Sequence, residues 1–143
     1  MNQRGFATLE VILMVMVIGI LASIAVPRFT NVTAAANTAK IQADLSTIET
    51  AVAIYKMEYG EDKTPDFTAL KNAGYLQAKP QAPSGSAYMQ KGESANTSTV
   101  ESISATADYT ITYDSTTKAA EVKFDGLTAD KFYLPKKTTP SGE

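Results

Sequence analysis

The chain has 143 residues and a nearly balanced charge, with 13 basic side chains against 15 acidic ones and a formal net charge of −2. This balance excludes a general electrostatic attraction to nucleic acid, and no specific nucleic-acid binding is predicted. Cysteine and histidine are both absent, which excludes disulfides, thiol nucleophiles, and the commonest metal ligand and general base.

The first predicted element is a strongly apolar helix over residues 6–26, preceded by a short, mostly polar segment, residues 1–5, that includes Arg4. At about 1.5 Å per residue this helix would extend roughly 30 Å, enough to cross the hydrocarbon core of a bilayer. Pro27 follows at once, and a proline inside a helix removes one hydrogen bond and produces a kink. We therefore expect a membrane-spanning helix over residues 6–27.

Three interpretations compete for this apolar segment, and Glu10 bears on each of them. A secretory signal peptide would have a shorter apolar stretch, ending at a small-residue cleavage site such as residues 23–25. An ordinary transmembrane anchor fits the length, but an ionised Glu10 in hydrocarbon costs about 2.5 kcal/mol or more unless it lies near the helix end and reaches the headgroups. A buried core helix would require a much larger protein around it.

Residues 28–59 are predicted to continue as an amphipathic helix. Its apolar stripe, at spacings of three and four, consists of Ile41, Leu45, Ile48, Val52, Tyr55 and Tyr59. We expect this stripe to be core, packed against a β-sheet. The same role is expected for the aromatic residues Tyr109, Tyr113, Phe124, Phe132 and Tyr133. The helix should end at Gly60, and since only Pro27 interrupts the pattern, residues 6–59 are predicted to form one long helix.

The remaining chain is predicted to contain a loop, a small sheet and a tail. Residues 60–99 should be mostly loop, with a short helix near 66–73 capped by Thr64 or Asp66. A sheet is expected over about residues 100–135. Its segments would be a hairpin of 108–114 and 120–124 around a turn at 115–118, an edge strand at 131–134, and a weaker strand at 100–104. With a frayed tail at 136–143, the fold class is α+β: a long N-terminal helix on a small antiparallel sheet.

Four aspartates, Asp108, Asp114, Asp125 and Asp130, are dense enough to raise the question of a metal site. The stretch 125–130 lacks the alternating acidic spacing of a strong calcium loop, so a turn or a solvated surface is expected, and no metal or other cofactor. The sequence also offers no nucleophile–base pair and no glycine-rich phosphate loop. We therefore expect no catalytic residue, and an enzyme is the least supported class.

The N-terminal segment resembles the prepilin leader of type IV pilins and type II secretion pseudopilins. The resemblance covers residues 1–59 and lies in Gly5, Phe6 and Glu10, with Gly19 and Pro27 at positions where the helix of assembled pilins partly unwinds. It implies that a prepilin peptidase cleaves between Gly5 and Phe6 and methylates Phe6, and that Glu10 is the family's glutamate, fifth after the cut.

The resemblance also implies a pilin-like organisation and a structural function. The parts would be a cleaved leader (1–5), a membrane and filament-core helix (6–27) and a soluble head (28–143). The subunit would be a single-pass protein of the inner, cytoplasmic membrane, surrounded by lipid until it polymerises through its helix into an extracellular type IV pilus, a fimbrium. Its partners would be copies of itself in a helical homopolymer, with or without minor pilins, the prepilin peptidase and an inner-membrane assembly platform.

Two alternatives to a pilus subunit stay open. One is a pseudopilin of a periplasmic type II secretion filament: residues 83–85 with Tyr88 resemble the proline-glycine-tyrosine loop of major pseudopilins, although the usual tryptophan is missing. Major pseudopilins can also bind calcium near their C-terminus. The paired C-terminal cysteines of many type IVa pilins are absent too, so the C-terminal loop is expected to be held by packing alone. The other alternative is a membrane-anchored binding domain that keeps residues 1–5, never polymerises and tolerates Glu10→Ala.

Overall fold

The computed structural model describes residues 3–92, 97–114 and 119–135. The turn predicted at 115–118 and the tail predicted at 136–143 lie outside the described residues. The chain divides into two compact units, Met1–Val32 and Thr33–Glu143, and each is described by itself.

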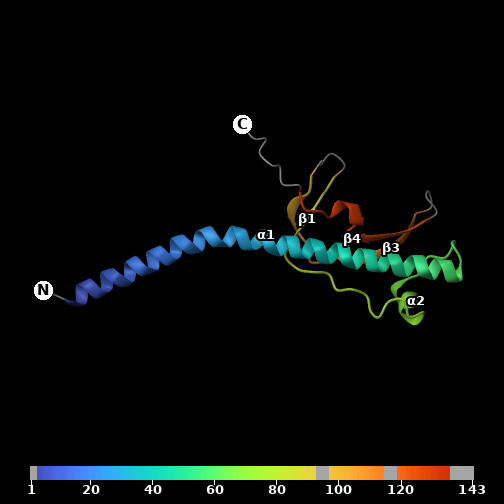
Figure 1. The fold of residues 1–143 in the computed structure, drawn as a ribbon, viewed down its shortest axis with the longest axis horizontal. Helices are drawn as coiled ribbons and strands as arrows, with labels where there is room; N and C mark the ends of the chain where they lie inside the picture. Colours follow the sequence, from blue (N-terminus) through green and yellow to red (C-terminus); the bar gives the residue numbers. More distant parts are fainter. Residues whose placement is uncertain (1–2, 93–96, 115–118, 136–143) are drawn as a thin grey trace, which may run out of the picture. The chain divides into compact units, whose positions relative to one another are not determined.

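Helix α1 runs from Gln3 to Tyr59 and contributes to both units (Figure 1). The prediction of one long helix is confirmed. The helix ends where Gly60 adopts a positive φ of 114°, a conformation that a residue without a Cβ atom adopts at little cost. The Gly60 amide donates to the Lys56 carbonyl at 2.9 Å, which satisfies one of the last helical acceptors, so the predicted stop is also confirmed.

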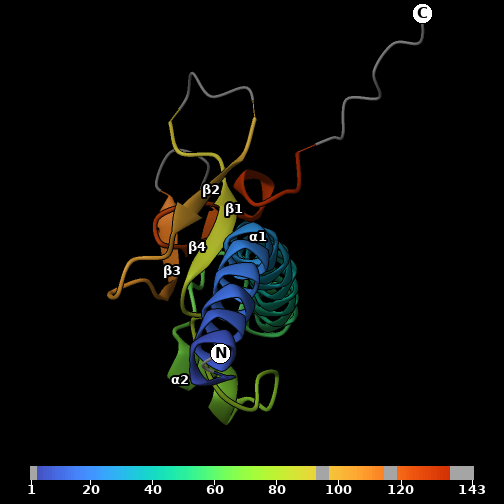
Figure 2. The ribbon, with the colours of Figure 1, turned by 90° about the vertical axis from the view of Figure 1, so that its left-hand side faces the viewer.

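The second unit contains two separate two-stranded antiparallel sheets. Strand β1 (Ser86–Met89) pairs with β2 (Thr99–Ser102), and β3 (Tyr109–Asp114) pairs with β4 (Ala119–Phe124). The hairpin predicted from alternation is therefore confirmed as β3 and β4, and the weaker strand candidate is β2. The prediction of one continuous sheet is wrong among the described residues, and β1 lies inside the segment predicted as loop. In Figure 2, β1 runs beside α1.

The edge strand predicted over residues 131–134 is also wrong. A short 3₁₀ helix, η1 (Ala129–Lys131), occupies its beginning, and the chain beyond it carries no strand in the described part. The reason is that the backbone carbonyls of Lys131, Phe132 and Tyr133 accept hydrogen bonds from scattered donors instead of a neighbouring strand.

A short helix, α2 (Phe67–Asn72), follows α1 as predicted. Its cap is Asp66, whose carboxylate accepts from the Ala69 amide at 2.6 Å. This bond satisfies an amide that has no intrahelical partner. Leu70 points into the core and is fully buried, so α2 closes one end of the head.

The core of the second unit lies between α1 and the two sheets. Ile41, Leu45, Ile48 and Val52 are all buried, which confirms the first four members of the predicted stripe. Tyr109, Phe124 and Phe132 meet them from the other side, with ring centroids 4.8 Å apart for the first pair and 5.9 Å for the second. Close aromatic packing of this kind adds about 0.5–1.5 kcal/mol per pair beyond simple burial.

Two aromatic residues expected in the core are exposed. Tyr59 is 50% exposed because it lies in the last turn of α1, beyond the end of the sheets, where it stacks on Tyr55 at 4.4 Å. Tyr55 itself is half-buried and also meets Tyr75 edge-on at 6.4 Å. Tyr113 is 48% exposed, near the far end of β3.

Candidate assembly surface of the N-terminal helix

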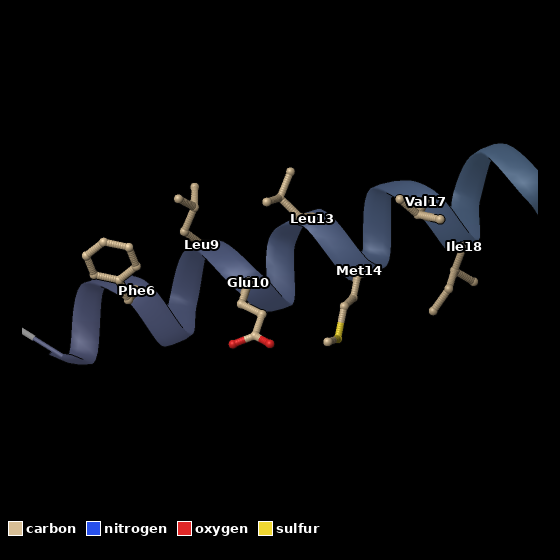
Figure 3. A pocket seen from close by; sticks show the side chains of 7 residues that line it. All are labelled: Phe6, Leu9, Glu10, Leu13, Met14, Val17 and Ile18. Atoms are coloured by element: carbon tan, nitrogen blue, oxygen red, sulfur yellow. The ribbon is translucent and has the colours of Figure 1, made fainter.

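The first unit presents a continuous apolar face of α1 that nothing in the unit covers. This face, here called the assembly surface, consists of Phe6, Leu9, Glu10, Leu13, Met14, Val17 and Ile18 (Figure 3). The spacings of three and four place its members along one side of the helix. Its apolar members are 54–78% exposed. A monomeric soluble protein rarely leaves so long an apolar face open, which marks it as an interaction surface.

Glu10 is the one charged member of the assembly surface. Figure 3 shows its carboxylate on the same side of the helix as Met14 and Ile18. Among the described residues it has no ion pair or hydrogen bond. Apolar side chains occupy the positions one turn before and after it, Phe6 and Met14, so its own helix offers no cation there. The described residues of the first unit therefore supply no compensating charge for this carboxylate.

The other predicted site residues lie along the same helix. Gly5 and Phe6 are in its first turns, and Phe6 is 78% exposed. A Cβ added at Gly5 or Gly19 would meet nothing within 4 Å, so neither glycine is required by packing inside the subunit. Pro27 lies within α1, and its side chain falls outside the description. The structure thus places Phe6 and Glu10 one turn apart but leaves Gly19 and Pro27 further along the helix.

The segment Gly5–Ile24 meets the length and hydropathy criteria for crossing a membrane, with a mean hydropathy of 2.4 over 20 residues. A secretory signal near the N-terminus meets the same criteria. A soluble core helix also meets them but is mostly buried, whereas no part of this segment is buried within the subunit.

In the second unit, polar side chains of α1 bind the loops and strands of the head directly. Asn37 donates to the carbonyls of Ser84 and Ser86 at 2.9 and 2.8 Å, and Lys40 donates to the Gln81 carbonyl at 2.8 Å. Sequence periodicity could not reveal these anchors, because their partners lie about 40–50 positions away in segments without regular spacing.

Asp44 and Thr38 make further hydrogen bonds between α1 and the strands of the head. The Tyr109 hydroxyl donates to Asp44 at 2.6 Å, and Asp44 also pairs with Lys40 at 2.5 Å. The buried Thr38 hydroxyl donates to the Ala34 carbonyl and accepts from the Tyr88 amide at 2.7 Å. Helix, strand β1 and strand β3 are therefore fixed in one register.

The C-terminal segment of the described chain, residues 131–134, here called the strap, is held by hydrogen bonds from three separate segments of the chain. Gln42 of α1 donates to the Phe132 carbonyl, the Gln90 amide donates to Lys131 at 2.8 Å, and Ser98 donates to Tyr133. The Phe132 side chain is fully buried. The expectation that packing alone holds this end of the chain was therefore wrong: hydrogen bonds share the task.

The aspartates considered for a metal are mostly engaged with lysines. Asp108 pairs with Lys79 at 2.5 Å, and this bond is the main cause that lowers its pKa. Asp125 lies 3.9 Å from Lys91 and Asp130 lies 3.3 Å from Lys131. Hydrogen bonding from Thr128 first, and then Lys131, lowers the pKa of Asp130. No cluster of three acidic ligands occurs in the described part of the chain.

Asp125 also has a structural task that its sequence context could have revealed. Asp125 and Gly126 both have positive φ, 49° and 79°, and the flanking Phe124 and Leu127 exchange two backbone hydrogen bonds at 2.8 and 2.9 Å. This is a type I′ turn, for which Asp-Gly is among the strongest sequence signals. The dipeptide marks a turn and not a loop of metal ligands.

A long helix with an apolar face that nothing in its own unit covers, together with a small α+β head, is the fold class that the sequence predicted. No family model matches the chain, and no solved structure is significantly similar to it. It is 32% identical over 102 residues to the type II secretion system core protein G of Klebsiella pneumoniae, covering 61% of this chain and 73% of that protein. It is also 32% identical over 108 residues to the type IV narrow pilus major component PilA5 of Thermus thermophilus, covering 76% and 84%.

A third relative is the ComG operon protein 3 homolog of Bacillus licheniformis, 26% identical over 87 residues, with 61% of this chain and 89% of that protein covered. The chain belongs to the family of type IV pilins and type II secretion pseudopilins. Proteins of this family are structural and not enzymatic.

Proposed function

We propose that the chain is the precursor of a type IV pilus subunit, a single-pass protein of the inner membrane that is cleaved between Gly5 and Phe6 and polymerises into a surface filament. The observation that carries this proposal is Glu10, a carboxylate that has no partner among the described residues and lies on an exposed apolar face. In this organisation residues 1–5 are the leader, residues 6–27 form the membrane and filament-core helix, and residues 28–143 form the head.

The unpaired carboxylate makes transfer of the subunit from lipid into the filament energetically favourable. Apolar helices gain little by exchanging lipid for one another, so the apolar face alone supplies little driving force. An ionised Glu10 in hydrocarbon costs about 2.5–3.5 kcal/mol on the insertion scale. The amine that cleavage creates on Phe6 of a neighbouring subunit neutralises it at a defined register, and such a pair is strong in a low-dielectric bundle. Prepilin peptidase and a membrane assembly platform are the partners that this route requires.

Cleavage is tested by mass spectrometry of the protein isolated from its host. We expect the N-terminal peptide to begin at Phe6 with a methylated amine. A chain that retains residues 1–5 would contradict the proposal and would favour an anchored domain that does not polymerise.

The role of the Glu10 charge is tested by Glu10→Gln, which preserves size and removes the charge. We expect surface filaments to fall at least tenfold while the subunit still accumulates in the membrane. Glu58→Gln is the matched control, because Glu58 is an exposed glutamate on the same helix outside the assembly surface. Wild-type filament levels in the Glu10→Gln strain would refute the charge mechanism.

A pseudopilin is the second candidate, supported by the similarity to the type II secretion system core protein G of Klebsiella pneumoniae and Aeromonas hydrophila. Deletion of the gene separates the two functions. Loss of long surface fibres with secretion intact supports a pilus subunit, whereas loss of protein export without any change in surface fibres supports a pseudopilin.

A further inference from the structure

A small groove opens between α1 and β4 in the second unit. It has a volume of about 260 Å³, and its lining includes Glu49, Val52, Ala53, Lys56, Ala120 and Val122. The floor is apolar, since Val52 and Val122 are buried. At its rim, Met57 is 82% exposed, which is unusual for a methionine in a compact domain. The groove therefore combines an apolar floor with charged ends.

The charges of the groove are not balanced within the subunit. Lys56 is 3.8 Å from Glu61 at one end. Glu49 has no hydrogen bond or ion pair to any residue that the structure describes. Partial burial raises the pKa of Glu49, because a carboxylate in such a place loses hydration without gaining a partner. The lining thus contains two carboxylates and one lysine, so its formal net charge is negative.

A lysine side chain has the chemistry that such a groove accepts. Its four methylene groups can lie along apolar surface while its ammonium group pairs with a carboxylate. Six lysines of the head already have carboxylate partners within the described residues: Lys40, Lys56, Lys79, Lys91, Lys123 and Lys131. Lys63 and Lys71 are exposed, and neither has an ion pair in the described ranges.

The geometry of an open filament favours Lys71 over Lys63. Subunits that add head to tail use two different patches of their surface. Lys63 is only two positions from Glu61, which itself lines the groove, so it belongs to the same patch. Lys71 lies in the last turn of α2, and Figure 1 shows α2 on the side of α1 away from β4.

We propose that this groove binds the Lys71 side chain of a second copy of the chain, with Glu49 pairing with its ammonium group. The inference rests on the proposed polymerisation and adds to it a contact between heads, separate from the assembly surface of the N-terminal helix. It gives Glu49 a partner, which no described residue of its own subunit supplies.

Cysteine cross-linking in assembled filaments tests the contact, and the natural chain contains no cysteine that would interfere. Two full-length single-cysteine chains, Ala53→Cys and Lys71→Cys, are co-expressed, and their filaments are oxidised. Only a contact between copies can join them. We expect a disulfide-linked dimer that is absent when either variant is expressed alone.

The matched control replaces Lys71→Cys with Lys63→Cys, an equally exposed lysine position. A dimer formed equally well with Lys63→Cys, or filaments that form without any dimer, would overturn the groove assignment and leave the proposed polymerisation intact. Failure of the natural chain itself to form filaments in its host would overturn the polymerisation, and the groove assignment with it.

Discussion

Thr38 contributes more to the fold than its small size suggests. Its hydroxyl is buried between α1 and β1, where it accepts from the Tyr88 amide at 2.7 Å and donates to the Ala34 carbonyl at 2.8 Å. An isosteric valine would leave the Tyr88 amide without its acceptor in a buried place. The cost of such an unsatisfied group is about 1–3 kcal/mol.

We therefore expect Thr38→Val to lower the free energy of unfolding by about 1–3 kcal/mol, measured by denaturant titration of the detergent-solubilised protein. Thr47→Val is the control, since the exposed Thr47 hydroxyl donates only to a carbonyl of its own helix, that of Ala43. It should change stability by less than about 0.5 kcal/mol. Equal effects of the two substitutions would mean that the contact with β1 contributes nothing.

Tyr109 makes the stability of the head sensitive to alkaline pH. Burial first, and then the hydrogen bond to Asp44, raise the pKa of its phenol above the ordinary value of 10.0. The folded pKa is higher than the unfolded one, so above pH 10 the unfolded chain loses this proton before the folded chain does. The stability contributed by Tyr109 is complete below that pH and is lost as the pH rises further.

The measurement is unfolding followed against pH between about 9 and 12, with tyrosinate absorbance recorded in parallel. We expect Tyr109→Phe to weaken the pH dependence of stability in this window and to cost about 0.5–1.5 kcal/mol at neutral pH through the lost hydrogen bond. Tyr113→Phe, on the same strand but 48% exposed, should leave the profile unchanged. An identical profile for Tyr109→Phe would contradict the assignment.

At the scale of elements, the strap closes the described C-terminal part of the head without a disulfide, since the chain contains no cysteine. Donors from α1, from the residue after β1 and from the residue before β2 bind three consecutive carbonyls of residues 131–133. Phe132 adds a fully buried ring that packs edge-on against Phe124. The ring and the hydrogen bonds depend on each other, since the carbonyls of residues 131–133 reach their donors only when the Phe132 ring is buried in the core.

We expect Phe132→Ala to destabilise the head by about 3–5 kcal/mol, because it opens a cavity in the core and releases the strap. Leu134→Ala, two positions further along and 56% exposed, is the control and should be close to neutral. Thermal unfolding of both variants, combined with limited proteolysis, measures the effect. If both variants unfold at the same temperature, the strap is not part of the cooperative core.

At the scale of the whole molecule, all buried side chains of the described chain lie between Ala34 and Phe132. The first unit, Met1–Val32, contributes none of them. We therefore expect a chain that lacks residues 1–32 to remain soluble without detergent and to unfold cooperatively, as seen by circular dichroism and denaturant titration. A truncated chain without a cooperative transition would show that the head needs the N-terminal helix in order to fold.

The sequence predicted those parts of the molecule whose signal is periodic or local. α1, its end at Gly60 and the hairpin of β3 and β4 all follow from spacing or from one turn residue, and the cap of α2 was narrowed to Thr64 or Asp66, of which the structure shows Asp66. Strand β1 was missed because it has only four residues, too few for the alternation of Ala87 and Met89 to stand out. The strap was wrongly predicted as an edge strand because its hydrogen-bond donors come from distant positions, which a local sequence pattern does not reveal.

One part of the candidate site could likewise be predicted from the sequence, and another part could not. An apolar run with one acid is visible in the sequence. The structure adds that no described residue of the first unit covers this run or pairs with Glu10. The groove beside β4 could not be predicted, because Glu49 and Val122 are 73 positions apart and become neighbours only when the hairpin packs on α1.

The strap has a consequence for how the subunit folds in the cell. A disulfide forms and rearranges over seconds to hours and depends on an oxidant, whereas a closure made of hydrogen bonds and one buried ring forms as fast as the chain collapses around it. Such a closure also needs no particular redox compartment. It also forms again after unfolding without an oxidant or a reductant, so residues 131–134 return to their place whenever the core refolds.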